Sequence, residues 1–337
     1  MNRVTSVILT ALLTLCNGMA QEKPLPIIDM HLHALPAALN GPPPTAICAP
    51  PQEWPTHDPS QSWASVFMEA LKNPNCESPI WGGKTDKEVM DKTLEILQEH
   101  NIYGVTSGSL VDDYFQNSPG RILPALHFSF FNKDLNPEKV KSMLLTGKYH
   151  VFGEVAIQYN GVSASDSIFE PYAKIAEDLD IPIGIHVGTG PPGAAYLPGL
   201  NNYRAKLHSP LVVEELLMRH PKLRIYLMHA GYPMIDDLIA VLWTHPQVYV
   251  DIGVICYGIP RKAFHTYLER IVEAGFGKRI MFGSDQMNWP ETIFVGIEAV
   301  QTADFLTNEQ KRDILYNNAA RFLRFSEEQI AQHHGNE

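Results

Sequence analysis

Apolar residues along this chain follow two alternating patterns, short continuous runs and longer stretches with helical spacing. From Lys87 onward, mostly apolar runs of about eight to ten residues alternate with stretches whose apolar positions recur every three or four residues. This alternation is typical of a parallel sheet covered by helices. The runs that we predict to be strands are 26–33, 101–109, 121–130, 149–157, 181–188, 223–231, 247–254 and 278–285.

Eight such strands are the number found in a (β/α)8, or TIM, barrel, so we expect an α/β fold of that type. An open doubly wound sheet is the alternative, but no glycine-rich phosphate-binding turn follows residue 33. The barrel is expected to occupy 21–325, followed by a polar C-terminal tail at 326–337, in which the stretch "AQHHGNE" with His333 and His334 is predicted to be disordered. The predicted helices of the barrel are 86–100, 137–146, 167–179, 210–220, 291–303 and 308–323.

One segment, residues 35–85, interrupts the alternation. It is rich in proline and shows little periodicity, apart from a short helix predicted at 62–72. Long connections in compact domains are usually functional lids or linkers. Because this one directly follows the first strand, it would lie over the mouth of the barrel, and we interpret it as a lid-like insertion.

The first twenty residues are predicted to be a secretory signal peptide. Arg3 gives a basic start, 4–15 is an apolar run too short to span a membrane, and Gly18-Met19-Ala20 fits a cleavage site. A lipoprotein anchored through Cys16 is the weaker alternative, because Leu15 is bulky where a lipobox carries a small residue. We therefore expect an exported protein, periplasmic or extracellular, without a membrane span.

Export affects the interpretation of the cysteines. An oxidising compartment permits disulfides, and Cys48 and Cys76 lie in the same irregular segment, so we predict that they pair and restrain it. Cys256 lies in an apolar, strand-like stretch and is predicted to be a buried free thiol.

The net charge of −11 argues against nucleic acid or an anionic membrane as partner. A small-molecule substrate is the expected partner. The sequence leaves the oligomeric state open, a homo-oligomer included.

Acidic and imidazole side chains occur at the ends of five predicted strands, where barrels of this kind build their active sites. His31 and His33 lie two residues apart and therefore share one face of the first strand. A single histidine in an apolar strand is often a core residue, but a whole set at one end of a barrel indicates a metal site. The set consists of His31, His33, Glu154, His186, His229 and Asp285.

Three other predicted strands carry weaker candidates. The second offers only the hydroxyls of Thr106, Ser107 and Ser109, and the seventh offers Asp251. On the third, His127 lies in the middle of the run, and its direction is left open.

The order of these residues resembles that of the metal-dependent hydrolases of the amidohydrolase superfamily. The stretches "GIHVG", "RHPKLRIYLMHAG", "MFGSD" and "ILYNNAARFLRF" are most similar to the amidohydrolase-2 branch, which includes aminocarboxymuconate semialdehyde decarboxylase. The resemblance runs from residue 27 to about 325.

The resemblance implies roles for the individual residues. His31, His33, His186 and Asp285 match the ligands of mononuclear members, and His229 matches their catalytic histidine or, in binuclear relatives, a ligand of the second metal. Glu154 stands where binuclear relatives carry a bridging carboxylate, which the mononuclear decarboxylases lack.

These assignments predict a metal-dependent enzyme with one or two divalent ions, zinc being expected and manganese, iron or cobalt the alternatives. Such an ion lowers the pKa of a bound water toward about 7. Asp285 would accept the proton of that water, and His229 would stabilise the oxyanion or hold a second metal. We expect hydrolysis of an ester, lactone or amide bond. The alternatives are a mononuclear decarboxylase and a non-catalytic metal-binding protein.

Substrate contacts are predicted in the loops that follow two later strands. Tyr203 and Arg204 lie in the long loop after the fifth strand, and Arg261 follows the seventh. Either arginine could bind a substrate carboxylate in a bidentate manner. The alternative for each arginine is a solvated surface charge.

Overall fold

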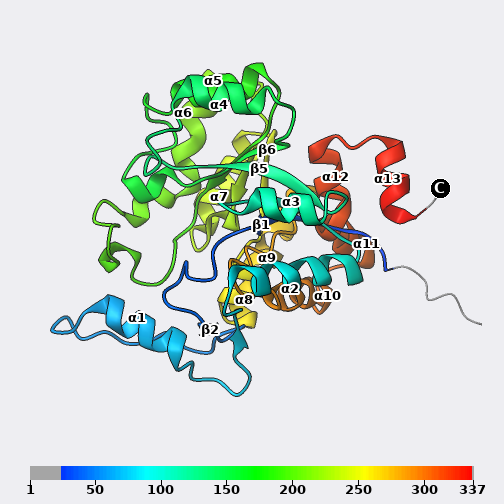
Figure 1. Cartoon of the computed structure of the whole chain (residues 1–337). Coiled ribbons are helices and arrows are strands. Elements are labelled where there is room, and N and C mark those ends of the chain that lie inside the picture. Colours follow the sequence, from blue (N-terminus) through cyan, green and yellow to red (C-terminus); the bar gives the residue numbers. More distant parts are fainter. Residues whose placement is uncertain (1–23, 336–337) are drawn as a thin grey trace, which may run out of the picture.

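Eight parallel strands form a nearly closed barrel in this computed structural model, which describes residues 24–335 (Figure 1). Beyond the last ladder, the Met30 N–H donates to the carbonyl of Phe282 and the Asp285 N–H to that of His31, linking the last strand to the first. The predicted α/β barrel is confirmed. The predicted signal peptide lies outside the described residues. In order around the barrel, the strands are β1 (Ile27–His33), β4 (Ile102–Ser107), β5 (Ile122–Phe128), β6 (Val151–Val155), β7 (Ile183–His186), β8 (Ile225–Met228), β9 (Val248–Asp251) and β10 (Ile280–Met281).

Helices follow the strands and cover the outside of the barrel. Their starts are encoded locally: the Thr85 side chain accepts from the Glu88 N–H at the start of α2, and Thr307 forms a capping box with Gln310 at the start of α11. Within the described residues, no helix is long and apolar enough to cross a membrane. The helices are α2 (Asp86–Glu99), α3 (Val111–Asn117), α4 (Pro137–Leu144), α5 (Glu170–Asp178), α6 (Glu214–Arg219), α7 (Ile235–Thr244), α8 (Ile255–Gly258), α9 (Arg261–Ile271), α10 (Thr292–Gln301), α11 (Asn308–Arg312) and α12 (Asn318–Leu323).

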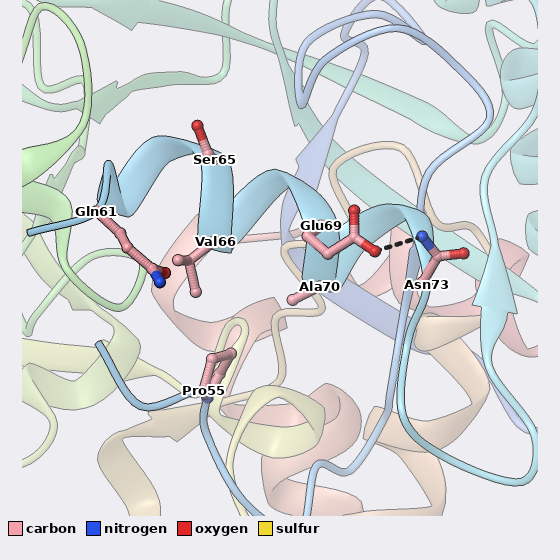
Figure 2. A pocket seen from close by; sticks show the side chains of 7 residues that line it. All are labelled: Pro55, Gln61, Ser65, Val66, Glu69, Ala70 and Asn73. Carbon is pink, nitrogen blue, oxygen red and sulfur yellow. Dashed lines mark hydrogen bonds between the residues drawn. The ribbon is translucent and has the colours of Figure 1, made fainter. Parts of the chain in front are cut away.

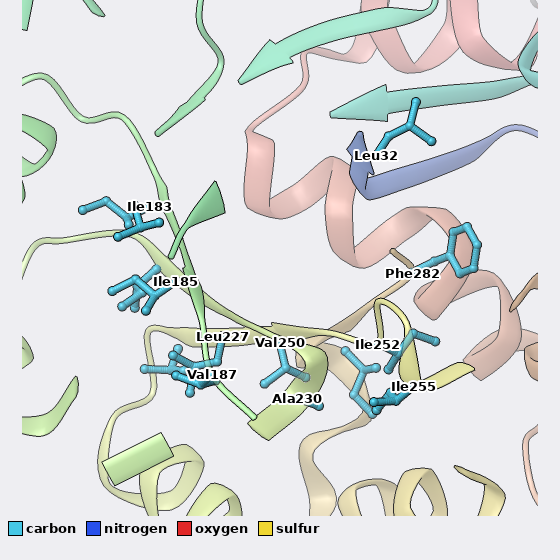
Figure 3. Packing of buried hydrophobic residues seen from close by; sticks show 14 of the residues in the cluster. Leu32, Ile183, Ile185, Val187, Leu227, Ala230, Val250, Ile252, Ile255 and Phe282 are labelled. Carbon is cyan, nitrogen blue, oxygen red and sulfur yellow. The ribbon is translucent and has the colours of Figure 1, made fainter. Parts of the chain in front are cut away.

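The apolar core has two layers, because side chains alternate between the two faces of each strand. The outer layer lies between strands and helices and includes Ile185, Leu227 and Val250 (Figure 3). The inner layer fills the barrel with residues such as Met30 and Tyr226. Whether a side chain belongs to the inner or the outer layer therefore tells which way its strand face points.

The insertion at 35–85 contains α1 (Trp63–Lys72) and an antiparallel pair, β2 (Ala46–Ile47) and β3 (Ile80–Trp81). A disulfide joins Cys48 to Cys76. The Trp289 indole donates to the Thr45 carbonyl (3.1 Å), and the Trp63 indole to the Pro192 carbonyl (2.8 Å). The insertion is thus fastened to loops that follow β10 and β7.

A groove of about 430 Å³ runs along one face of α1, where Val66 and Ala70 lie near Pro55 (Figure 2). All of the residues that line it belong to the insertion itself: Pro55, Gln61, Ser65, Val66, Glu69, Ala70 and Asn73. The groove is therefore distinct from the polar strand ends described below.

The polar C-terminal segment is helical at 327–334, whereas the stretch with His333 and His334 was expected to be a disordered tail. It forms α13 (Glu327–His334), which begins with a capping box between Ser326 and Gln329. The His333 ring stacks on Tyr103 with centroids 3.6 Å apart, and its Nδ1 lies 2.9 Å from the hydroxyl of Tyr316. These aromatic contacts, which the sequence pattern does not reveal, hold the helix against the barrel.

Candidate metal centre

The six side chains predicted as metal ligands converge at the C-terminal end of the barrel, and all are buried. They form two groups, each with ligand atoms within 4.8 Å of one another. The first group is His31, His33 and Asp285, and the second is Glu154, His186 and His229.

Glu154, a member of the second group, also lies next to the first. Its Oε2 is 3.6 Å from His33 Nε2, whereas its Oε1 is 3.9 Å from the Nε2 atoms of both His186 and His229. Asp285 completes the first group, with Oδ1 3.0 Å from His33 Nε2 and 3.8 Å from His31 Nε2. The Glu154 carboxylate thus presents Oε2 to the first group and Oε1 to the second.

The electrostatics of this cluster favour bound positive charge. Burial disfavours the charged form of His31, but the Asp285 and Asp251 carboxylates outweigh this effect and raise its pKa to about 10. Burial likewise opposes ionisation of Glu154, yet the surrounding imidazoles, His229 first, hold its pKa well below the ordinary value. Buried carboxylates that stabilise a cation in this way suit a divalent metal ion.

The hydrogen-bonding pattern also fits a metal. Within the described part of the chain, His31 Nε2 and His229 Nε2 are buried and have no hydrogen-bond partner, and they face Asp285 and Glu154 respectively. Buried polar atoms are normally paired, so unpaired imidazole nitrogens beside carboxylates are a ligand set suited to zinc or a similar ion.

Asp251 and Asp29 support the cluster, although the sequence did not assign them this role. Asp251 Oδ2 lies 3.1 Å from His31 Nδ1, and its Oδ1 accepts from the His229 N–H (2.9 Å). Asp29 Oδ1 accepts from the His31 N–H (3.0 Å) and the Ser284 N–H (2.9 Å). A carboxylate behind a metal-binding histidine fixes the orientation of the ring, as Asp251 does for His31, whereas Asp29 positions the His31 backbone. The only sequence signal was the position of Asp251 at a strand end.

Close packing around His31 explains two glycines. A Cβ at Gly253 would lie 2.7 Å from His31 Nδ1, and one at Gly283 would lie 2.8 Å from His31 Cβ. Neither position therefore has room for a side chain. Gly283 is the glycine of the "MFGSD" stretch.

Tyrosines form the wall beside His186. The Tyr159 hydroxyl lies 3.1 Å from His186 Nε2. Tyr203, a predicted substrate contact, is buried behind it, and its hydroxyl accepts from the Gly190 N–H (2.8 Å). Tyr203 therefore packs against the site wall through the Tyr159 ring, whose centroid is 5.6 Å from its own.

The structure does not bring the two predicted substrate-binding arginines to the cluster. Arg204 donates to the carbonyls of Asn201 (3.0 Å) and Tyr203 (2.6 Å) in its own loop. Arg261, at the start of α9, donates to the carbonyls of Cys256 (3.0 Å) and Val295 (3.2 Å). Both guanidiniums bind backbone carbonyls, which holds the surrounding loops and helices together.

The profile of the amidohydrolase-2 family, described as amidohydrolase, matches residues 149–325, and the chain belongs to this family. The matched region includes Glu154, His186, His229 and Asp285, whereas His31 and His33 precede it. The family assignment confirms the resemblance seen in the sequence motifs. It also makes the protein a member of a metal-dependent enzyme family.

One curated relative is protein fluG of Emericella nidulans, 22% identical over 162 residues. The match covers 44% of this chain and 18% of that protein, so the chain spans less than a fifth of its length.

Solved structures with low sequence identity share the fold. An uncharacterised TIM-barrel protein of Bordetella bronchiseptica has a TM-score of 0.56 at 16% identity, covering 91% of this chain and 100% of that one. The 5-carboxyvanillate decarboxylase of Sphingomonas paucimobilis gives 0.54 at 12% identity, covering 90% and 100%. A probable 2-pyrone-4,6-dicarboxylic acid hydrolase of Acinetobacter baumannii gives 0.52 at 14%, covering 89% and 99%.

Proposed function

We propose that this protein is an exported hydrolase that holds two divalent ions, expected to be zinc, and cleaves an ester, lactone or amide bond. The position of Glu154 carries this proposal. Its Oε2 faces the group of His31, His33 and Asp285, and its Oε1 faces His186 and His229. A carboxylate in this position can bridge two ions, an arrangement that serves hydrolysis by activating water and polarising the scissile bond.

The chain's own groups have separate tasks in this mechanism. Bound ions would supply Lewis acidity and a water of lowered pKa. Asp285 would accept the proton of the attacking water and return it to the leaving group, since it lies inside the cluster, with Oδ1 3.0 Å from His33 Nε2 and Oδ2 3.8 Å from His229 Nδ1. Asp251 and Asp29 keep His31 oriented. Burial of all these groups limits the access of bulk water, which strengthens their electrostatic effect.

Two features support export. The first twenty residues have the pattern of a signal peptide. The disulfide between Cys48 and Cys76 suits an oxidising compartment.

A mononuclear decarboxylase is the competing function, favoured by the structural similarity to 5-carboxyvanillate decarboxylase. It would require one ion only, held by His31, His33, His186 and Asp285. The role of Glu154 therefore distinguishes the two functions.

The test is the metal content of the protein purified without chelators, compared with that of Glu154→Gln. We expect two ions per chain in the unsubstituted protein and about one in the variant. Glu298→Gln is the matched control, because Glu298 lies on α10 with an exposed side chain that pairs with Arg261. One ion per chain, unchanged by Glu154→Gln, would contradict the bridged site, and CO₂ release from aromatic carboxylates would then establish a decarboxylase.

A further inference from the structure

A polar side chain lies at the C-terminal end of each of the eight barrel strands or within a few residues after it. Most of these groups contact one another: Ser107 Oγ lies 3.3 Å from His33 Nδ1, and Asp251 contacts His31. The exception is His127 on β5, whose imidazole makes no hydrogen bond or ion pair within the described residues. The set from β1 to β10 is His33, Ser107, His127, Glu154, His186, His229, Asp251 and Asp285.

The direction of His127 follows from its neighbours on β5. Leu126 and Phe128 belong to the outer core layer, against the helices. Ala125 belongs to the inner layer and lies near His31 and Glu154 inside the barrel. Because side chains two residues apart share a strand face, His127 also points into the barrel, one step closer to the mouth.

The register places His127 beside the bridging carboxylate. β5 and β6 pair through Leu126 with Phe152 and through Phe128 with Val155, so that His127 stands opposite Gly153 and Glu154. Although Leu126 and Phe128 are buried, His127 is exposed to solvent. A side chain that points into the barrel and is still exposed must reach solvent at the mouth of the barrel.

The electrostatic environment of His127 agrees with this position. Desolvation by the surrounding protein lowers its pKa, and the Glu154 carboxylate opposes this effect. The charges of His33 and His31 also act on the His127 ring, which places it near the polar cluster.

We propose that His127 is a substrate-binding residue, whose imidazole forms a hydrogen bond to an uncharged polar group next to the scissile bond. The preferred substrates are then esters, lactones or amides that carry a hydroxyl, carbonyl or amide group beside the reacting carbonyl. This inference rests on the proposed function, since it takes the scissile bond to lie at Glu154 and Asp285. A neutral imidazole suits this role because one ring nitrogen donates and the other accepts.

Two small hydroxamates test the proposal by binding alone. Acetohydroxamate and glycolohydroxamate both chelate metal ions, and they differ by one hydroxyl beside the carbonyl. Calorimetric titration of the metal-loaded protein should give a several-fold to about tenfold tighter Kd for glycolohydroxamate, the size of one hydrogen bond. His127→Phe should abolish this preference, whereas His127→Gln, which keeps a donor and an acceptor, should retain part of it.

His150→Gln is the matched control. His150 is also exposed, but it immediately precedes β6 and so lies at the opposite end of the barrel. This variant should keep both the preference and the metal content. The proposal is overturned if the unsubstituted protein does not discriminate between the probes, or if His127→Phe still does.

Metal content and hydrolysis of δ-valerolactone, measured on the same proteins, separate this inference from the proposed function. If His127 is needed to discriminate between the two hydroxamates, but the protein neither holds two ions nor hydrolyses the lactone, the proposed hydrolase function is refuted and the binding role of His127 stands. If the protein hydrolyses the lactone and His127→Phe still prefers glycolohydroxamate to the same extent, the binding role of His127 is refuted and the proposed hydrolase function stands.

Discussion

The side-chain amide of Gln286 holds the backbone of His33 on both sides. Its Oε1 accepts from the His33 N–H (2.9 Å), and its Nε2 donates to the His33 carbonyl (2.7 Å). The two residues are 253 positions apart in sequence, and both are buried. Gln286 thereby fixes the end of β1 that carries His31 and His33. It is the next residue in sequence after Asp285, whose carboxylate lies beside both of these histidines.

Replacing Gln286 with alanine is expected to weaken the metal site without removing a ligand. Two buried backbone groups of His33 would lose their partners, which costs about 1–3 kcal/mol for each unsatisfied group. Metal affinity should fall about tenfold to hundredfold, the usual effect of losing a group that orients a ligand. Competition with a chelator of known affinity measures this change. Gln301→Ala, at an exposed position of α10, should change neither metal affinity nor Tm.

Removing the disulfide with Cys48→Ser and Cys76→Ser should destabilise the protein. The two cysteines are 28 residues apart, and a closed loop of this length is expected to contribute about 3–4 kcal/mol by restricting the unfolded chain. Urea unfolding measures the loss. Reductant should lower the stability of the unsubstituted protein toward that of the double variant and leave the variant unchanged. Equal stability of the two oxidised proteins would contradict this prediction.

A pH-dependent contribution is expected from Glu177, which lies away from the metal site. Its Oε2 is 3.0 Å from Nδ1 of the buried His220, and its Oε1 accepts from the Lys222 N–H. Partial burial raises the pKa of Glu177, but these hydrogen bonds outweigh that effect and lower it below the ordinary value. Since folding depresses this pKa, the stabilisation is fully present above the unfolded value of about 4.3 and is lost as the pH falls through the folded value.

Glu177→Gln should therefore lower stability at pH 7, by about 1–2 kcal/mol for a hydrogen-bonded charged group. The difference from the unsubstituted protein should shrink below about pH 4. Unfolding midpoints in urea at pH 7 and pH 3.5 give the two values. Glu215→Gln, at an exposed position of α6, serves as the reference. A pH-independent difference would mean that Glu177 acts through packing and not through its charge.

The sequence predicted the barrel because its signals are local. Each strand is a continuous apolar run, and the predicted helix at 86–100 corresponds to α2 (Asp86–Glu99) within one residue. Residues at strand ends could also be grouped, because parallel strands bring their C-terminal ends to the same side. His31 and Asp285 could thus be assigned to one site although they lie at opposite ends of the barrel sequence.

Roles that depend on tertiary packing could not be predicted. Gln286 follows Asp285 directly, but nothing near it in the sequence shows that it binds the His33 backbone. The face of His127 was ambiguous, because the run at 121–130 has apolar residues on both faces. From the sequence, Arg261 was predicted to bind substrate, with a solvated surface charge as the alternative. Only the fold shows that its guanidinium binds the carbonyls of Cys256 and Val295.

The hydrogen bond from the Trp63 indole to the Pro192 carbonyl limits how the loops of this barrel can be exchanged. The loops of a barrel can ordinarily be exchanged one at a time, but here the insertion after β1 interlocks with the loop after β7. Gly193 has a positive φ of 69°, and a Cβ there would overlap the Trp63 indole. The insertion after β1 and the loop after β7 therefore form one structural unit. Transplanting a loop from a relative to alter substrate choice would require both segments to be exchanged together.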